Sequence, residues 1–397
     1  MKKHKLGLLS RLLLGILCGM LLGSLGGLLH MQDNPVFVSM VRLFVTFTTL
    51  FSTFLNFIIP LLIISFVSIG LADLGKKANR LFGITLLLAY GSTVISGLLA
   101  FCAGKSILPN IISEITDNTA DSTAFETLFT IEAEPVCGVM TALILAFLLG
   151  LGIANSKGTT LLGCIRDLQD IITLALNKII IPLIPFYIAG LFCKIAAEGE
   201  LLSTIQVFIK LFVLILICQW IYIALQHLAA SLICRDNKFK GIKNLAPAYF
   251  TALGTQSSAS TIPVNLDCTK KNGVRNYIAD FVIPLCATIH LAGDTICLVL
   301  GSMGIMLANG ITPTLSMFVP FILMLGITMV AAPGVPGGGV MAALGLITSM
   351  LGFTEPMQQL IISLHFSQDS FGTACNISGD QAIAYIVDHF DRRAERK

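Results

Sequence analysis

The last apolar segment of the chain carries five polar side chains at spacings that place them on one face of a helix. They are His365, Asp369, Thr373, Asn376 and Asp380, and at 100° per residue they fall within an arc of about 80°. Carboxylate, amide and hydroxyl oxygens grouped in this way suit a hard cation or an ammonium group. The alternative is a helix packed through polar and small side chains, although two carboxylates exceed what such packing requires.

Two tips of small or polar residues interrupt apolar stretches upstream of this stripe. In the first, Gln256, Ser257 and Ser258 offer polar side chains and backbone N–H groups at the start of a helix, where an anion such as a carboxylate is attracted. The second tip is Pro-Gly-Val-Pro-Gly-Gly-Gly at 333–339, whose backbone can approach a ligand closely and also move. The alternatives are a serine-rich loop for the first tip and a surface turn for the second.

His290 and Asp294 are isolated polar residues in another apolar segment, and Asp294 is the only residue between 281 and 353 that is charged at neutral pH. At positions i and i+4 of one helix they could hydrogen-bond each other, and a histidine titrates near physiological pH. Both proton transfer and a purely structural pair fit this spacing. Ser92 and Thr93 could provide oxygens to an ion site or bond back to their own helix.

The composition indicates which elements must hold these residues. Charged residues are only 12% of the 397, whereas apolar residues are 55%. A soluble domain has about 25% charged residues, so there are too few charges to cover a water-soluble surface. The net charge of +3 does not suggest a nucleic-acid partner, and 11 scattered cysteines do not suggest a disulfide framework. The chain is therefore predicted to be a polytopic membrane protein in contact with the lipid bilayer.

A helix needs about 20 apolar residues to cross the hydrocarbon core. Six candidate spans precede the first tip, at 7–29, 36–74, 81–104, 137–156, 170–196 and 201–234. Basic residues cluster before the first span, after the second and sixth, and at the C-terminus, while acidic residues fill the loop after the third. The positive-inside rule then places both termini in the cytoplasm. The N-terminus resembles a signal peptide, but its long apolar run favours an uncleaved first span.

Two segments, 244–274 and 312–354, contain the tips and are predicted to form helical hairpins. Lysines flank the first at both ends, which favours a hairpin that enters and leaves the membrane from the cytoplasmic face. Each hairpin precedes an apolar helix interrupted by small and polar residues, at 276–309 and 355–390. This repeat of hairpin and broken helix is typical of the binding site of a transporter.

Four segments resemble the dicarboxylate/amino acid:cation symporter family: 251–264, 284–295, 334–339 and 369–380. The resemblance implies an all-α polytopic membrane protein with eight transmembrane helices, two re-entrant helical hairpins and inverted repeats. It also implies an elevator-type transporter that forms a homotrimer in the cytoplasmic (inner) membrane of a bacterium or archaeon.

The resemblance also implies a division of the chain. Residues 1–243 would form six transmembrane helices, mainly for scaffold and trimerisation, with the third and sixth joining the transport domain. Residues 244–397 would form the transport core, with hairpin 1 at about 244–274, helix 7 at about 276–309, hairpin 2 at about 312–354 and helix 8 at about 355–390.

Matching the family motifs residue by residue assigns roles to individual positions. Ser257 and Ser258 match the tip that binds the substrate α-carboxylate, and Asp369 matches the aspartate that receives the α-amino group. The full set implied for the substrate is Gln256, Ser257, Ser258, Val335, Pro336, Gly337, Asp369, Gly372, Thr373 and Asn376. The set implied for sodium is Cys286, Thr288, His290, Asn376 and Asp380, with Ser92, Thr93, Met329, Val330 and Ala332 as further candidates.

Two departures from the family pattern bear on the substrate. Family members that carry acidic substrates have an arginine where this chain has Gly372, and some relatives place it instead where this chain has Gln256. A second substrate carboxylate therefore lacks a bidentate partner. We expect a small neutral amino acid such as serine, threonine or alanine, coupled to Na⁺. The alternative is a dicarboxylate or acidic amino acid, with H⁺ or Na⁺ as the coupling ion.

Other departures bear on the coupling ion. The family motif Asn-Met-Asp-Gly is His290-Leu291-Ala292-Gly293 here, so a carboxylate ligand of a third sodium site is missing at 292. His365 occupies another family aspartate position. We expect fewer coupled sodium ions than in the acidic branch, with His290, Asp294 and His365 as possible proton carriers. No organic cofactor is expected.

Other classes of protein fit the sequence less well. Asp369 and Asp380 would lie about 16 Å apart along one helix, too far for the carboxylate pair of an intramembrane aspartyl enzyme. Neither Gly-x-Ser-x-Gly nor His-Glu-x-x-His occurs. We therefore expect no enzymatic activity. A channel stays an alternative, although tips able to close on a ligand favour alternating access.

Overall fold

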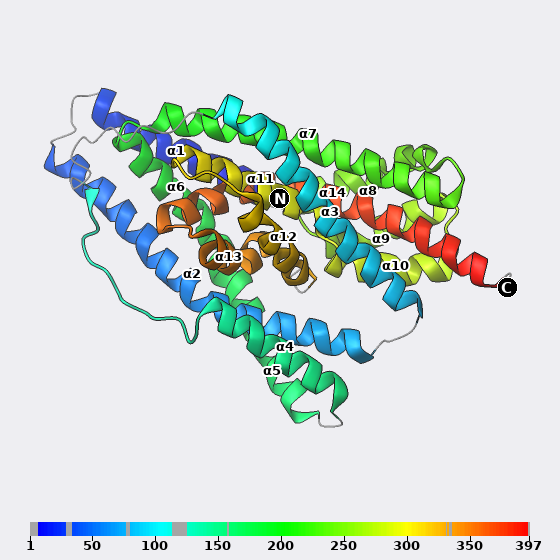
Figure 1. The fold of residues 1–397 in the computed structure, drawn as a ribbon. Coiled ribbons are helices and arrows are strands. Elements are labelled where there is room, and N and C mark those ends of the chain that lie inside the picture. Colours follow the sequence, from blue (N-terminus) through cyan, green and yellow to red (C-terminus); the bar gives the residue numbers. More distant parts are fainter. Residues whose placement is uncertain are drawn as a thin grey trace, which may run out of the picture.

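A computed structural model describes residues 7–28, 34–76, 80–112, 125–156, 159–330, 332 and 336–395 of the chain. Within these ranges every regular element is a helix, as the sequence predicts (Figure 1). Five helical stretches are long and apolar enough to cross a membrane: Pro35–Ala72, Arg80–Ile111, Thr160–Ala197, Leu201–Cys234 and Asn276–Ala308. Many of their apolar side chains, such as Leu87 and Leu232, face outward, which suits contact with lipid.

Each of the six predicted spans corresponds to helix in the structure. They are α1 (Leu8–Leu28), α2 (Pro35–Lys76), α3 (Arg80–Ile111), α4 (Val139–Asn155), α5 (Thr160–Ala175) continued through the π-helix η2 (Leu176–Ile180) into α6 (Ile181–Ala197), and α7 (Leu201–Cys234). The fifth span begins ten residues earlier than the predicted 170, because the polar first half of α5 is amphipathic and helical although it is not apolar throughout.

The first predicted hairpin is formed by α8 (Gly241–Thr255) and α9 (Ser258–Lys271), which pack against each other after a short 3₁₀ turn, η3 (Lys238–Lys240). The start of α8 and the end of α9, which lie away from the tip, also contact each other. Asn244 Nδ2 donates to Asn272 Oδ1 at 2.7 Å, and Asn272 Nδ2 donates to the Gly241 carbonyl at 3.0 Å. The chain therefore reverses at the tip around Gln256 and Ser257.

The helix after this hairpin is broken, as predicted, into α10 (Asn276–Ile289) and α11 (Ala292–Ala308). Between the two parts, His290 is extended with φ −121° and ψ 99°, and Leu291 has φ −122° and ψ 53°, so neither residue is helical. The second pair of helices, α12 (Leu315–Met329) and α13 (Gly338–Leu351), also packs together.

The prediction of a second broken helix is wrong. Residues Glu355–Glu395 form one continuous helix, α14, which contains the whole polar stripe. Glycine and short polar residues weaken a helix only slightly, and here the surrounding elements hold the segment on every side. α14 packs on α3, α7, α8, α10 and α11, so it lies at the centre of this part of the fold (Figure 1).

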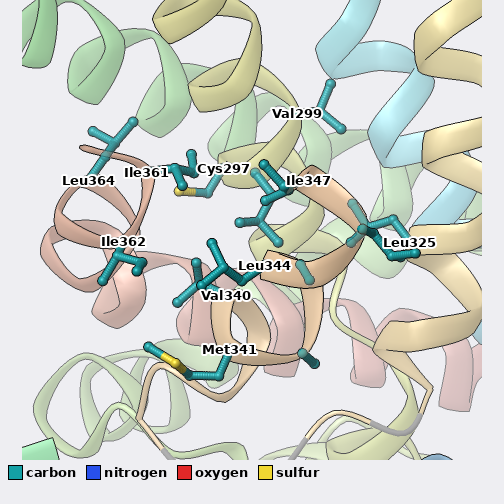
Figure 2. Packing of buried hydrophobic residues seen from close by; sticks show 14 of the residues in the cluster. Cys297, Val299, Leu325, Val340, Met341, Leu344, Ile347, Ile361, Ile362 and Leu364 are labelled. Carbon is teal, nitrogen blue, oxygen red and sulfur yellow. The ribbon is translucent and has the colours of Figure 1, made fainter. Parts of the chain in front are cut away.

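Apolar packing fixes the second helix pair against this centre. Figure 2 shows Val340 and Leu344 of α13 beside Ile361 of α14 and Cys297 of α11, and all four are fully or almost fully buried. The remaining helices pack mainly on one another: α1 packs on α6, and α2 packs on α4 and α6, while α2 and α4 also contact α13. Figure 1 shows α4 and α5 on one side of the molecule and α8, α9 and α10 on the other.

The break between α10 and α11 lies directly against α14, and this close approach requires a glycine. A Cβ atom on Gly293 would lie 2.4 Å from the Gly372 carbonyl oxygen. We predict that Gly293→Ala destabilises the protein by about 1–3 kcal/mol, because the added methyl group overpacks a rigid contact. The melting temperature of the purified protein in detergent measures this effect. Gly83→Ala in α3, where nothing lies within 4 Å of the new atom, is the matched control.

Candidate functional site

A cavity lies where the first tip, the break between α10 and α11, the start of α13 and the middle of α14 meet. The space between its lining atoms is about 330 Å³, with the adjoining open solvent included. Eleven residues line it: Gln256, Ser258, Ala287, Thr288, Leu291, Asp294, Ala332, Gly339, Asp369, Thr373 and Asn376. Seven of them have polar side chains, two of these are carboxylates, and none of these described lining residues is basic. The site therefore favours a ligand that carries a positive group.

Asp369 is the carboxylate that is held by the start of α13. Its Oδ2 atom accepts a hydrogen bond of 2.8 Å from the backbone N–H of Gly337. Gly337 caps α13 with φ +73°, and a Cβ atom there would meet the ring of Phe366, so the position requires glycine. The positive end of the α13 dipole thus faces Asp369, which is 95% buried yet lines the cavity.

Asp294 is held by two side chains of α14. Its Oδ1 atom lies 2.8 Å from His365 Nε2, and its Oδ2 atom accepts from Asn376 Nδ2. Asn376 Oδ1 in turn accepts from the Gly293 N–H at 2.7 Å, so both the oxygen and the nitrogen of its amide bond to the start of α11. Candidate ligand atoms of Asp294, His365 and Asp369 lie within 4.8 Å of one another, and all three residues are buried.

His290 and Asp294 do not pair with each other, although their spacing allows it in a straight helix. The break after Ile289 turns them to different partners, and His290 Nδ1 lies 2.9 Å from Asp380 Oδ1. On its other side, His290 Nε2 lies 2.9 Å from Ser92 Oγ, which also accepts from Gln226 Nε2 at 3.0 Å. His290 therefore joins α3 and α7 to α14.

The chemistry of Asp380 suits a cation. Both His290 and Asp380 are almost completely buried, and the second oxygen of Asp380, Oδ2, has no hydrogen-bond partner among the described residues. A buried carboxylate oxygen without a donor is costly unless a cation or water satisfies it. Asp380 and the side-chain or backbone oxygen of Asn376, four residues earlier, are thus ligands of the kind that Na⁺ accepts.

At the first tip, Gln256 adopts φ +53° and its Nε2 donates to Ser370 Oγ at 2.9 Å. Ser257 caps α9, since its Oγ accepts from the Ser260 N–H at 3.3 Å. Gln256 and Ser258 line the cavity, whereas Ser257 does not. A helix therefore starts at this tip, and Ser258 is the residue of that helix that lines the cavity.

The remaining predicted residues have varied positions. Thr288 and Ala332 line the cavity, and Met329 is fully buried. Thr93 bonds back to the Ala89 carbonyl at 3.0 Å, so it follows the helix-bonding alternative while Ser92 does not.

Five other predicted positions lie off the cavity lining or beyond the described structure. The Cys286 carbonyl accepts the His290 N–H at 2.9 Å. Pro336 and Val330 are half-buried, and Val335 lies outside the described residues. Gly372 faces the start of α11, and a Cβ atom added there would lie 3.8 Å from Asp294 Cγ.

The sequence prediction missed several residues that hold the site. Ser370 holds Gln256, while Gln219 and Gln226 of α7 bond to the Gly293 carbonyl and to Ser92. The two glutamines are seven residues apart in a largely apolar helix, so they share one face. That spacing was a usable signal. Ser370 offered none, because one more serine in a polar stripe is not distinctive.

The profile of the sodium:dicarboxylate symporter family matches residues 8–390. The chain belongs to this family. The resemblance inferred from four short segments is thus confirmed over almost the whole length, and the family is one of transporters. Together with the long apolar helices, this membership makes the chain a multi-pass membrane transporter.

Curated relatives agree with this assignment. The symporter is 28% identical over 363 residues to a protein named serine/threonine transporter SstT from Acinetobacter baumannii (strain AYE), an alignment that covers 86% of this chain and 89% of the relative. It is 25% identical over 258 residues to excitatory amino acid transporter 2 of Homo sapiens, covering 63% of this chain and 44% of that protein. For excitatory amino acid transporter 1 of Bos taurus the identity is 26% over 303 residues, covering 72% and 55%.

The paired groups around Asp294 lead to a stability prediction. Asp294→Ala would leave His365 and Asn376 without their buried partner, so we expect a loss of about 3–5 kcal/mol and a large fall in melting temperature. Asp267→Ala is the control, because the Asp267–Lys271 ion pair is exposed and contributes about 0–1 kcal/mol. Equal melting temperatures for the two variants would contradict the structural role of Asp294.

Proposed function

We propose that this chain is a secondary active symporter that imports a small neutral amino acid, of the serine, threonine or alanine kind, together with Na⁺. The observation that carries the proposal is a cavity with a carboxylate for an ammonium group and, among the described residues that line it, no basic side chain for a second carboxylate. The name of the Acinetobacter relative, a serine/threonine transporter, supports the same substrate class.

In the proposed complex, Asp369 receives the substrate ammonium. The substrate carboxylate lies at the start of α9 beside Ser258, where backbone N–H groups and the helix dipole favour an anion. Thr373 and Gln256 then lie near the substrate side chain. Pairing of Asp369 with an ammonium group also offsets the repulsion between its charge and that of Asp294.

The proposed coupling between Na⁺ and the amino acid arises because each ligand neutralises a buried carboxylate. Na⁺ binds at Asp380 and Asn376, and Asn376 also holds the broken start of α11 that lines the cavity. The cation therefore stabilises the arrangement to which the amino acid binds. By linkage, each ligand then raises the affinity for the other. The state with both ligands bound is the one that moves, which makes the transport a symport.

The proposed architecture has eight transmembrane helices, two re-entrant hairpins formed by α8–α9 and α12–α13, and an elevator motion. The packing of α3 and α7 on α11 and α14 supports a transport domain made of residues 244–397 together with these two helices, which would move against a scaffold built mainly from the other helices before residue 244. We further propose a homotrimer in the inner membrane of a bacterium or archaeon.

The orientation is proposed from the charged ends of the helices. Arg275, between α9 and α10, forms ion pairs with Asp388, Asp391 and Glu395 of α14 at 2.6–2.8 Å. The base of the first hairpin and the end of α14 therefore lie on one side of the membrane. Their lysines and arginines favour the cytoplasm, and both termini are placed there.

Uptake into proteoliposomes tests the function. We predict that an inward Na⁺ gradient drives uptake of labelled serine, that threonine and alanine compete, and that aspartate and succinate do not. Strong aspartate uptake without competition by neutral amino acids would instead establish the acidic-substrate alternative. Sodium-independent uptake that His290→Ala abolishes would identify H⁺ as the coupling ion. Flux without saturation would indicate a channel.

The ammonium assignment is tested by Asp369→Asn. The amide keeps the size of the side chain but removes the charge, so we predict that the KM for serine rises about 10- to 100-fold, as expected for the loss of a charged hydrogen bond. Asp280→Asn, which removes a half-exposed partner of Lys270 at the far end of α10, is the control. A variant at 369 that transports serine with an unchanged KM would refute the assignment.

A further inference from the structure

We propose that His290 is a positioning residue for the cation site. Its Nδ1–H group holds one oxygen of Asp380, so that the other oxygen, Oδ2, is directed to the cation. This inference rests on the proposed function in one respect, namely that Asp380 binds the cation. It gives His290 a role that requires no change in the protonation of its ring.

The direction of the hydrogen bond between His290 and Asp380 follows from the atoms involved. An ionised carboxylate only accepts hydrogen bonds, and His290 Nδ1 lies 2.9 Å from Asp380 Oδ1. Nδ1 must therefore carry the proton. The side chains of both residues are 0% exposed, so water does not compete for this bond.

The other nitrogen of the ring is held by Ser92. Tyr222 donates its proton to the Ser92 carbonyl at 2.6 Å, and Gln226 donates to Ser92 Oγ at 3.0 Å. Ser92 Oγ can then donate to His290 Nε2, or accept from it while donating to the Tyr222 oxygen at 2.9 Å. In both arrangements Nδ1 stays a donor to Asp380. The positioning role is thus the same in either case.

Close packing prevents the ring from turning away. A Cβ atom on Gly379, the residue before Asp380, would lie 2.4 Å from His290 Cε1 and 2.5 Å from Gln226 Nε2. The imidazole and the amide therefore rest directly on the backbone of α14. A ring fixed on one side by Ser92 and on another by this backbone keeps its Nδ1–H aimed at Asp380.

The result is a carboxylate with one oxygen held and one oxygen open. Oδ2 is buried and has no partner among the described residues, unlike both oxygens of Asp294. Outer hydrogen bonds of this kind orient metal ligands and typically change affinity 10- to 100-fold when removed. Na⁺ affinity should therefore depend on the Nδ1–H group although His290 contributes no side-chain atom to the cation.

Three substitutions at His290 distinguish the role of Nδ1 from that of Nε2. The amide nitrogen of asparagine can replace Nδ1 and keep the bond to Asp380. That of glutamine can replace Nε2 and keep the contact with Ser92, whereas leucine fills similar space and donates nothing. His290→Asn, His290→Gln and His290→Leu therefore distinguish a donor to Asp380 from a group that only fills space. His389→Asn, nine residues after Asp380 on α14, is a control at a histidine outside this network.

The readout is Na⁺ binding by the purified full-length protein in detergent. NaCl replaces KCl at constant ionic strength, and the rise in melting temperature gives an apparent dissociation constant. We expect His290→Asn and His389→Asn to stay within about threefold of the parent protein, and His290→Gln and His290→Leu to bind Na⁺ about tenfold or more weakly. Ser92→Ala, which removes only the outer contact, should weaken binding less than His290→Leu.

Two results would overturn the inference alone. One is a His290→Leu protein that melts cooperatively and binds Na⁺ as tightly as the parent. The other is a His290→Asn protein that binds Na⁺ as weakly as His290→Leu. A parent protein whose melting temperature rises equally in Na⁺ and K⁺ would instead overturn the proposed sodium coupling, and with it the role of His290. The failure of the inference and the failure of the proposed function are therefore distinguishable.

Discussion

Burial of three carboxylates in an apolar core is the constraint on which the rest of the structure depends. The negative charge of each carboxylate must be satisfied by hydrogen bonds or by a cation, and the three carboxylates differ in the partners that they have. Asp294 has side-chain partners on both oxygens, Asp369 has one backbone donor and borders a cavity, and Asp380 has one imidazole partner and an unpartnered oxygen. The number of hydrogen-bond partners of each carboxylate fits its proposed role, which is structural for Asp294, substrate binding for Asp369 and cation binding for Asp380.

The fold provides this compensation through irregular backbone where helices break or begin. The break at His290 turns one helix so that its two polar residues find separate partners on α14, and the start of α13 supplies a backbone N–H to Asp369. Exposed backbone groups are tolerated inside a membrane only where they line protein or a cavity. The continuous α14 is the rigid element against which these irregular segments are arranged.

Much of this arrangement follows from sequence patterns, and the failures have physical causes. The apolar spans, the two helix pairs and the stripe on α14 follow from hydropathy and from a period of 3.6 residues. The continuity of α14 could not be predicted, because glycines and short polar residues mark a possible break, whereas packing on neighbouring helices such as α7, α8 and α11 decides whether it occurs. The partners of His290 could not be predicted either, since Ser92, Gln226 and Asp380 come from three helices that no local pattern relates.

We propose that the cavity carboxylate and the cation site act together on a neutral amino acid. Calorimetric titration of the purified protein with serine, in Na⁺ and in K⁺ at equal ionic strength, measures this coupling. We expect serine to bind in Na⁺ with an affinity that rises as the Na⁺ concentration is raised, and to bind at least about tenfold more weakly in K⁺. Equal serine affinity in Na⁺ and K⁺ would show that the two sites do not act together.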